Sequence, residues 1–117
     1  MTLHTTARTF GDATIVECSG RLVLGEESAQ LREMVKGVLA TSKSVVLDLG
    51  GVTYIDSSGL GTLVGLYSTA RNAGGGIKLA HLSTRTRDML QMTRLLTVFD
   101  VYDRAEEAAA AFKSAAG

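Results

Sequence analysis

The stretch Val45 to Gly65 reads VVLDLGGVTYIDSSGLGTLVG and predicts a strand, a polar turn and a helix in immediate succession. Its first five residues, Val45 to Leu49, are almost continuously apolar and are followed by Gly50-Gly51, a pattern typical of a strand covered on both faces. We therefore expect this strand in the middle of a sheet. After the turn, apolar side chains repeat at helical spacing: Leu60, Leu63, Val64, Tyr67 and Ala70. Asn72-Ala73-Gly74-Gly75-Gly76 then predicts the end of this helix.

Strands and helices are predicted to alternate on both sides of this unit. Apolar or β-branched stretches at Ala13 to Cys18 and Arg21 to Leu24, set among glycines, predict two early strands. From Glu26 to Thr41 the apolar residues follow the i, i+3, i+4, i+7 period of a half-buried helix. Downstream, the sequence predicts a strand, a short helix and a last strand at Ile77 to Ala80, Thr84 to Thr93 and Val98 to Tyr102.

The C-terminal part matches the start of one more helix. Asp103-Arg104-Ala105-Glu106 fits a capping box, in which Asp103 accepts from first-turn amides and Glu106 reaches back. An alanine-rich helix ending near Phe112 should follow. Strands that alternate with helices predict an α/β fold with the helices packed on the sheet.

Length and charge narrow the function classes. The 117 residues, 45% of them apolar, suffice for one hydrophobic core, so residues 1–117 are expected to form a single domain. Twelve basic and twelve acidic residues give zero net charge, which disfavours nucleic acid and anionic membranes as partners. No stretch approaches the roughly twenty apolar residues of a membrane span, and residues 1–10 carry no secretory signal. We expect a soluble, cytoplasmic protein whose partner is a protein or a small molecule.

Residues that could bind a metal are few and scattered. The single cysteine, Cys18, is interpreted as a small strand residue in a reducing compartment, with a reactive thiol as the weaker alternative. His4 lies near the N-terminus and His81 at a strand end, so both are expected to be surface residues. The sequence therefore predicts no zinc site, no catalytic histidine and no cofactor.

The turn Val52 to Gly61 is the densest polar feature. A helix start favours an anion by roughly 0.3–1 kcal/mol, and a phosphoryl group on Ser57 would lie in that field. A plain helix cap at Asp56, Ser57 or Ser58 explains part of the same pattern. Gly59 and Gly61 stand where alanine would favour the helix by up to ~1 kcal/mol each, which suggests that something approaches the backbone closely.

Neither of two common enzyme motifs is complete at this turn. Gly59-Leu60-Gly61 starts like a dinucleotide fingerprint, but Val64 occupies the position of its third glycine and no acidic residue follows about twenty residues later. The serine-hydrolase motif G-x-S-x-G is absent as well. The sequence therefore favours a binding module over an enzyme.

The stretch Val45 to Gly65 resembles the core signature of the STAS family, the domain shared by anti-sigma factor antagonists and sulfate transporters. The resemblance extends from about Leu3 to Phe112, and Asp56-Ser57-Ser58-Gly59 is similar to the antagonist branch in particular. It implies a single STAS domain with a mixed sheet of about four to five strands, packed with about four helices. It also implies that this protein is a regulator without catalysis of its own.

In that family the turn is a phosphorylation switch. The resemblance implies that Ser57 is the phosphoacceptor, with Ser58 as the fallback, and that the turn from Asp56 through Gly59, Leu60 and Gly61 contacts the partner. The implied partners are an anti-sigma factor that is itself a serine kinase, and a serine phosphatase that resets the switch. Binding would occur in the unphosphorylated state and end on phosphorylation.

Three points remain open at this stage. Asp56 either orients the serine hydroxyl and helps hold a metal–nucleotide complex during transfer, or is a helix cap. Arg21 follows Gly20 where antagonists commonly carry an acidic residue, so it either selects a differently charged partner or is a solvated surface residue. The alternative function is a stand-alone STAS subunit that docks on a transport ATPase or on a sensory, stressosome-like assembly.

Overall fold

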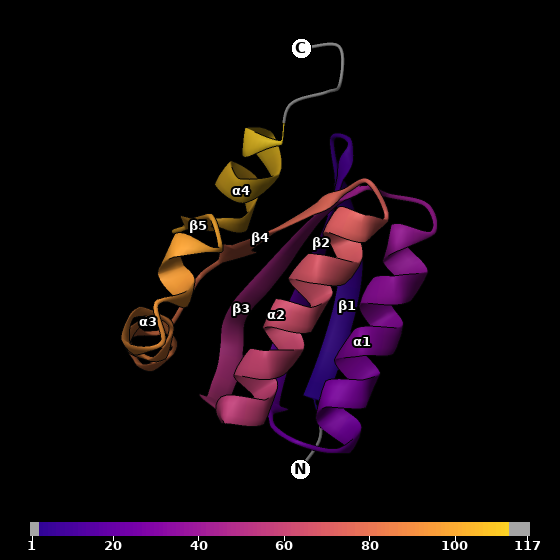
Figure 1. Cartoon of the computed structure of the whole chain (residues 1–117). Coiled ribbons are helices and arrows are strands. Elements are labelled where there is room, and N and C mark those ends of the chain that lie inside the picture. The colour runs from indigo at the N-terminus through magenta and orange to yellow at the C-terminus, as the bar shows by residue number, and fades with distance from the viewer. Residues whose placement is uncertain (1–2, 113–117) are drawn as a thin grey trace.

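The computed structural model of the chain describes residues 3–112 (Figure 1). The elements follow one another in the order β1 (Leu3–Phe10), β2 (Ala13–Leu22), α1 (Glu26–Leu39), β3 (Ser44–Ile55), α2 (Ser57–Asn72), β4 (Gly76–Ala80), α3 (Thr84–Met92), the short 3-10 helix η1 (Leu95–Thr97), β5 (Val101–Tyr102) and α4 (Ala105–Ala111). This confirms the predicted α/β fold, with a five-stranded mixed sheet and four α-helices. None of the helices in the described part is long and apolar enough to cross a membrane.

The sheet keeps the order of the sequence, β1-β2-β3-β4-β5. β1 pairs antiparallel with β2, and every other pairing is parallel. β3 is the middle strand, as its apolar sequence predicted. All five residues from Val45 to Leu49 are buried, because helices cover both faces of this strand.

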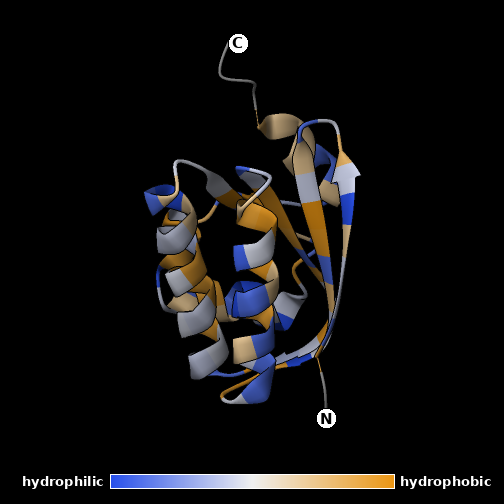
Figure 2. Cartoon of the chain, turned by 90° about the vertical axis from the view of Figure 1, so that its right-hand side faces the viewer, coloured by the Kyte–Doolittle hydropathy of each residue, from blue (hydrophilic) through white to orange (hydrophobic). Residues whose placement is uncertain are grey.

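Two apolar clusters lie on opposite faces of the sheet. Val45 and Leu47 face the larger cluster, which α1 and α2 close, whereas Val46 faces a smaller cluster beneath the alanines of α4. Figure 1 shows α1 and α2 side by side over the sheet. In Figure 2 the apolar residues gather in the central strands and on the sides of the helices that face them.

The N-terminal part of the sheet differs from the prediction. The strand β1 was not expected, since Leu3 is its only buried residue and its other side chains give no apolar alternation. Arg21 to Leu24 is not a separate strand, because β2 runs without interruption from Ala13 to Leu22. Gly20, at φ 109°, instead adjoins a register shift within β2.

The predicted strand Val98 to Tyr102 is mostly irregular. Only Val101 and Tyr102 pair with β4, and η1 precedes them. Phe99 turns inward and meets the Tyr67 ring edge-on at 5.4 Å between centroids. Burial of this phenylalanine in the main core explains why the segment joins the sheet only at Val101.

The predicted capping box at Asp103 is wrong. The residue that precedes α4 is Arg104, and no side chain caps this helix by a hydrogen bond. Glu106 does not reach back but forms an ion pair with Arg8 of β1, at 2.9 Å between Oε2 and Nη2. This exposed pair links α4 to the first strand. The helix ends at Ala111, close to the predicted end.

Candidate docking site at the start of α2

Asp56 is the residue that caps α2. Its Oδ1 accepts a hydrogen bond from the Gly59 N–H at 2.7 Å, and its extended backbone suits an N-cap. Its Oδ2 accepts from the Leu24 N–H at 3.4 Å, so the same carboxylate also holds the loop between β2 and α1. Of the three capping residues that the sequence left open, the structure selects Asp56.

The two serines that follow face different surroundings. Ser57 is the first residue of α2 and is exposed, so its hydroxyl is accessible to another protein. Ser58 is half-buried, and its carbonyl accepts a hydrogen bond from the Thr62 hydroxyl at 3.1 Å. The accessible hydroxyl at the helix start therefore belongs to Ser57.

Gly59 is explained by packing inside the molecule. A Cβ at this position would overlap the carbonyl oxygen of Leu22 and lie 2.9 Å from Cγ1 of Ile55. The close approach that the sequence suggested here is thus made by the chain's own strand β2. Gly59 and Leu60 are buried, so they support the turn from beneath.

No contact inside the molecule explains the glycine at Gly61. A Cβ built on it would meet nothing within 4 Å, and the same holds for Gly65 one turn later on the same side of α2. Each glycine costs the helix up to ~1 kcal/mol relative to alanine. Because neither glycine has a side chain, the backbone of α2 is open to another molecule beside Ser58.

These glycines form one wall of a groove between α1 and α2. The groove encloses about 490 Å³, and Leu24, Ser28, Arg32 and Ser58 also line it. Leu24 is 75% exposed and lies at this groove, where it offers an apolar contact to another molecule. The α1–α2 groove therefore combines an exposed apolar residue with hydroxyls and bare backbone.

Arg32 supplies the only charge among the residues that line the α1–α2 groove. Its guanidinium makes one long hydrogen bond, 3.4 Å from Nη1 to the Thr62 hydroxyl, and no ion pair within residues 3–112. A cation without a carboxylate partner inside the fold is available to a carboxylate of another protein.

Arg21 lies near the same end of the molecule. Its guanidinium stands 5.3 Å from the centroid of the Tyr54 ring, a cation–π geometry between the ends of β2 and β3. Both side chains are exposed, with Tyr54 at 39%. The arginine at the position where antagonists commonly carry an acidic residue thus forms a stacked surface pair next to the start of α2.

The remaining reactive groups are elsewhere. Cys18 is buried, and burial together with the charge of Asp48 raises the pKa of its thiol to about 12. Cys18 lies in β2, as predicted, and its raised pKa disfavours the alternative of a reactive thiol. His81, which follows β4, is exposed, and its Nδ1 lies 3.0 Å from Oδ1 of the buried Asp48 within β3. In the described part of the chain no three histidine, cysteine or carboxylate side chains gather as metal ligands.

Sequence reasoning did not identify Leu24 and Arg32. Leu24 was assigned to a strand, and Arg32 is a single charge on an amphipathic helix, which no motif marks. Both reach the site because α1 packs alongside α2. Of the two glycines that the sequence analysis singled out, Gly61 pointed to this surface, whereas Gly59 packs inside the molecule.

Comparison with known proteins identifies the family. The STAS domain profile matches residues 4–108. A candidate anti-sigma factor antagonist of Bordetella bronchiseptica, BtrV, is 32% identical over 105 residues, which cover 89% of this chain and 90% of that protein. The anti-sigma-B factor antagonist of Bacillus subtilis is 32% identical over 76 residues, covering 65% of this chain and 70% of that protein.

Solved structures agree in the fold. The crystal structure of a candidate anti-sigma factor antagonist from Thermotoga maritima superposes with a TM-score of 0.82 at 23% identity, and the match covers 92% of each chain. The sequence match over nearly the whole domain and the shared topology have one explanation. This chain belongs to the STAS domain family.

Proposed function

We propose that this protein is an anti-sigma factor antagonist that docks through the start of α2 and the α1–α2 groove, and that phosphorylation of Ser57 releases it. In this proposal the anti-sigma factor is also the serine kinase that modifies Ser57, and a separate serine phosphatase restores binding. The names of its relatives in Bordetella and Bacillus support this role. The proposed partners act in the cytoplasm, and we place the protein there.

The exposure of Ser57 beside the groove is the observation that carries the proposal. The Ser57 hydroxyl is free for transfer, and the groove beside Ser58 carries bare glycines, the exposed Leu24 and the unpaired Arg32. An interface that covers such a groove would also cover the helix start. One surface thus combines a modifiable residue with features of a docking site.

The local geometry favours a switch that acts on docking and not on the fold. A phosphoryl group adds about −1.5 to −2 charges near neutral pH. The Gly59 N–H is already bound by Asp56 and is not available to a phosphate on Ser57. The charge on Ser57 would remain at the surface, where a docking partner would have to desolvate it. Asp56 acts as a cap in this scheme, and we assign the chain no catalysis.

Ser57→Asp and Ser57→Ala test the proposal against the anti-sigma factor that co-purifies with the chain from its own host. We expect Ser57→Asp to raise the dissociation constant at least about 100-fold, equivalent to about 2.7 kcal/mol, and Ser57→Ala to bind like the wild type. Ser58→Ala is the matched control and should bind and release normally. Equal affinity of Ser57→Asp and Ser57→Ala would refute the switch.

Tandem mass spectrometry of the host protein separates this function from its alternative. A phosphorylated Ser57 and a kinase-like anti-sigma factor in the purified complex would support the antagonist. If Ser57 is never modified and a transport ATPase or a sensory assembly co-purifies, the protein is a docking subunit instead.

A further inference from the structure

β1 is an edge strand with one unpaired side. It pairs with β2 over its whole length, from Leu3 opposite Gly20 to Phe10 opposite Ala13. The Gln30 side chain of α1 donates to the Leu3 carbonyl at 2.6 Å, which marks Leu3 as a residue whose backbone faces away from β2. Because backbone groups alternate along an antiparallel strand, Thr5, Ala7 and Thr9 also direct their N–H and C=O groups to the free edge.

The common protections of a sheet edge are missing from β1. Natural edges carry lysine, proline or bulges that prevent pairing with another strand. The sequence LHTTARTF contains neither lysine nor proline, and its register with β2 is uninterrupted. Its one arginine, Arg8, is held by Glu17 and Glu106 on the opposite side of the strand from α1.

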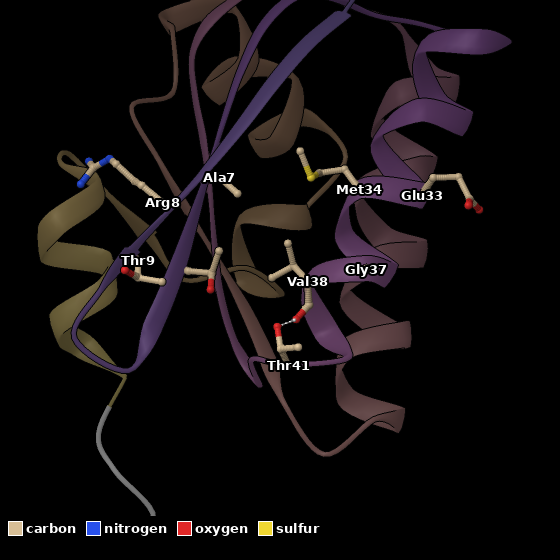
Figure 3. Close-up of a pocket in the computed structure, with 9 residues that line it drawn as sticks. Ala7, Arg8, Thr9, Glu33, Met34, Gly37, Val38 and Thr41 are labelled. Atoms are coloured by element: carbon tan, nitrogen blue, oxygen red, sulfur yellow. Dashed lines mark hydrogen bonds between the residues drawn. The ribbon is translucent and has the colours of Figure 1, made fainter.

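An apolar groove lies along this edge. It encloses about 810 Å³ between β1 and α1, with Thr14 of β2 at its end. Figure 3 shows Met34 and Val38 pointing from α1 towards Ala7, while Glu33 points away. The charged residues that line the groove are Glu33 and Arg8, and the side chains of both point away from it. Depletion of charge is typical of the centre of a protein interface.

Gly37 belongs to the same side of α1. A Cβ at Gly37 would meet nothing within 4 Å, so no contact inside the molecule explains a glycine in the last turn of this helix. It costs up to ~1 kcal/mol relative to alanine. This glycine therefore leaves the groove beside β1 open and lowers the stability of the isolated chain.

We propose that the groove and the β1 edge form the interface with a second copy of this chain. Two β1 strands would pair antiparallel across a twofold axis and join two five-stranded sheets into one. The groove of one copy would face that of the other, so that Met34 and Val38 of both copies close over the two Ala7 residues.

The residues of β1 restrict the register in which two copies of the strand can pair. With Ala7 opposite Ala7 of the second copy, Thr5 pairs with Thr9, and Leu3, already capped by Gln30, needs no strand partner. A shift in one direction would place Arg8 opposite Arg8 of the second copy, which is unfavourable. A shift in the other would require Leu3 to pair. Of these three registers, only the one with Ala7 opposite Ala7 satisfies both conditions.

Sedimentation equilibrium of the full chain and of Ala7→Pro tests the dimer. Proline removes only an N–H that faces the free edge, so the monomer should fold while pairing is blocked. We expect a concentration-dependent dimer for the wild type and for the matched control Ala7→Ser, and at least a tenfold higher dissociation constant for Ala7→Pro. A wild-type chain that stays monomeric up to its solubility limit, or an Ala7→Pro dimer of unchanged strength, would overturn the proposal.

Cross-linking settles the register and covers the case in which Ala7→Pro does not fold. Ala7→Cys should form a covalent dimer with a short bifunctional thiol reagent, whereas Thr9→Cys should do so only when mixed with Thr5→Cys. Buried Cys18 does not compete for the reagent. Efficient cross-linking of Thr9→Cys alone, or none with Ala7→Cys, would contradict the pairing. These experiments use the chain without the anti-sigma factor and leave Ser57 unchanged, so their outcome is independent of the Ser57 switch.

Discussion

Asp56 joins two segments that are more than thirty residues apart in sequence. One carboxylate oxygen caps α2 at Gly59, and the other accepts from Leu24 in the loop before α1. Removal of this side chain leaves a helix amide without its cap and frees the loop. Asp56→Ala should lower the free energy of unfolding by about 1–2 kcal/mol, as measured by urea denaturation. Asp56→Asn keeps the capping oxygen and should lose much less; equal losses would show that the cap contributes little.

Gly59 and Gly61 should respond to alanine in opposite ways. At Gly59 the new methyl group would overlap the Leu22 carbonyl, which strand pairing holds in place, so the protein should lose several kcal/mol of stability or fail to fold. At Gly61 the methyl group enters open space, and the helix should gain up to ~1 kcal/mol. Thermal unfolding of the two variants measures both effects. If Gly61→Ala is more stable yet binds the anti-sigma factor more weakly, the glycine serves docking; unchanged binding would remove it from the interface.

The Cys18 thiol should make stability sensitive to alkali. Burial raises its pKa from 9.0 to about 12, so the folded protein keeps a proton that the unfolded chain loses in this range. This contribution is intact below pH 9 and falls by about 1.4 kcal/mol per pH unit above it. Urea denaturation between pH 8 and pH 10.5 should show a steeper loss for the wild type than for Cys18→Ala. Parallel curves would contradict a buried, protonated thiol.

At the scale of elements, the sequence predicted those helices and strands whose buried residues recur at a regular spacing. The helices α1 and α2 and the central strand β3 have clear apolar faces, and the structure places them as expected. β1 has no such pattern because only Leu3 is buried, so its pairing with β2 cannot be inferred from side chains. The expected capping box failed for a different reason. Glu106 has a long-range partner in Arg8, which local sequence rules do not include.

At the scale of the whole molecule, one part of the candidate site could be predicted from the sequence and another part could not. The turn from Asp56 to Gly61 is continuous in sequence, so its helix start and its exposed serine could be predicted. Leu24 and Arg32 reach it only through the packing of α1 beside α2, which sequence spacing does not specify. Interpretation of the motif alone therefore leads to the proposed switch and omits most of the surface that would recognise a partner.

Arg32 is where this surface can be tested without altering the switch. Its guanidinium is the one charge in the α1–α2 groove and has only a long bond to the Thr62 hydroxyl. We expect it to bind a carboxylate of the anti-sigma factor, so Arg32→Glu should weaken binding by tenfold or more, about 1.4 kcal/mol, with little change in thermal stability. Lys36→Glu makes the same charge change on α1 outside the groove and is the matched control. If both variants lose affinity equally, net charge is responsible; if only Arg32→Glu does, the groove is the docking site and its occupant is acidic.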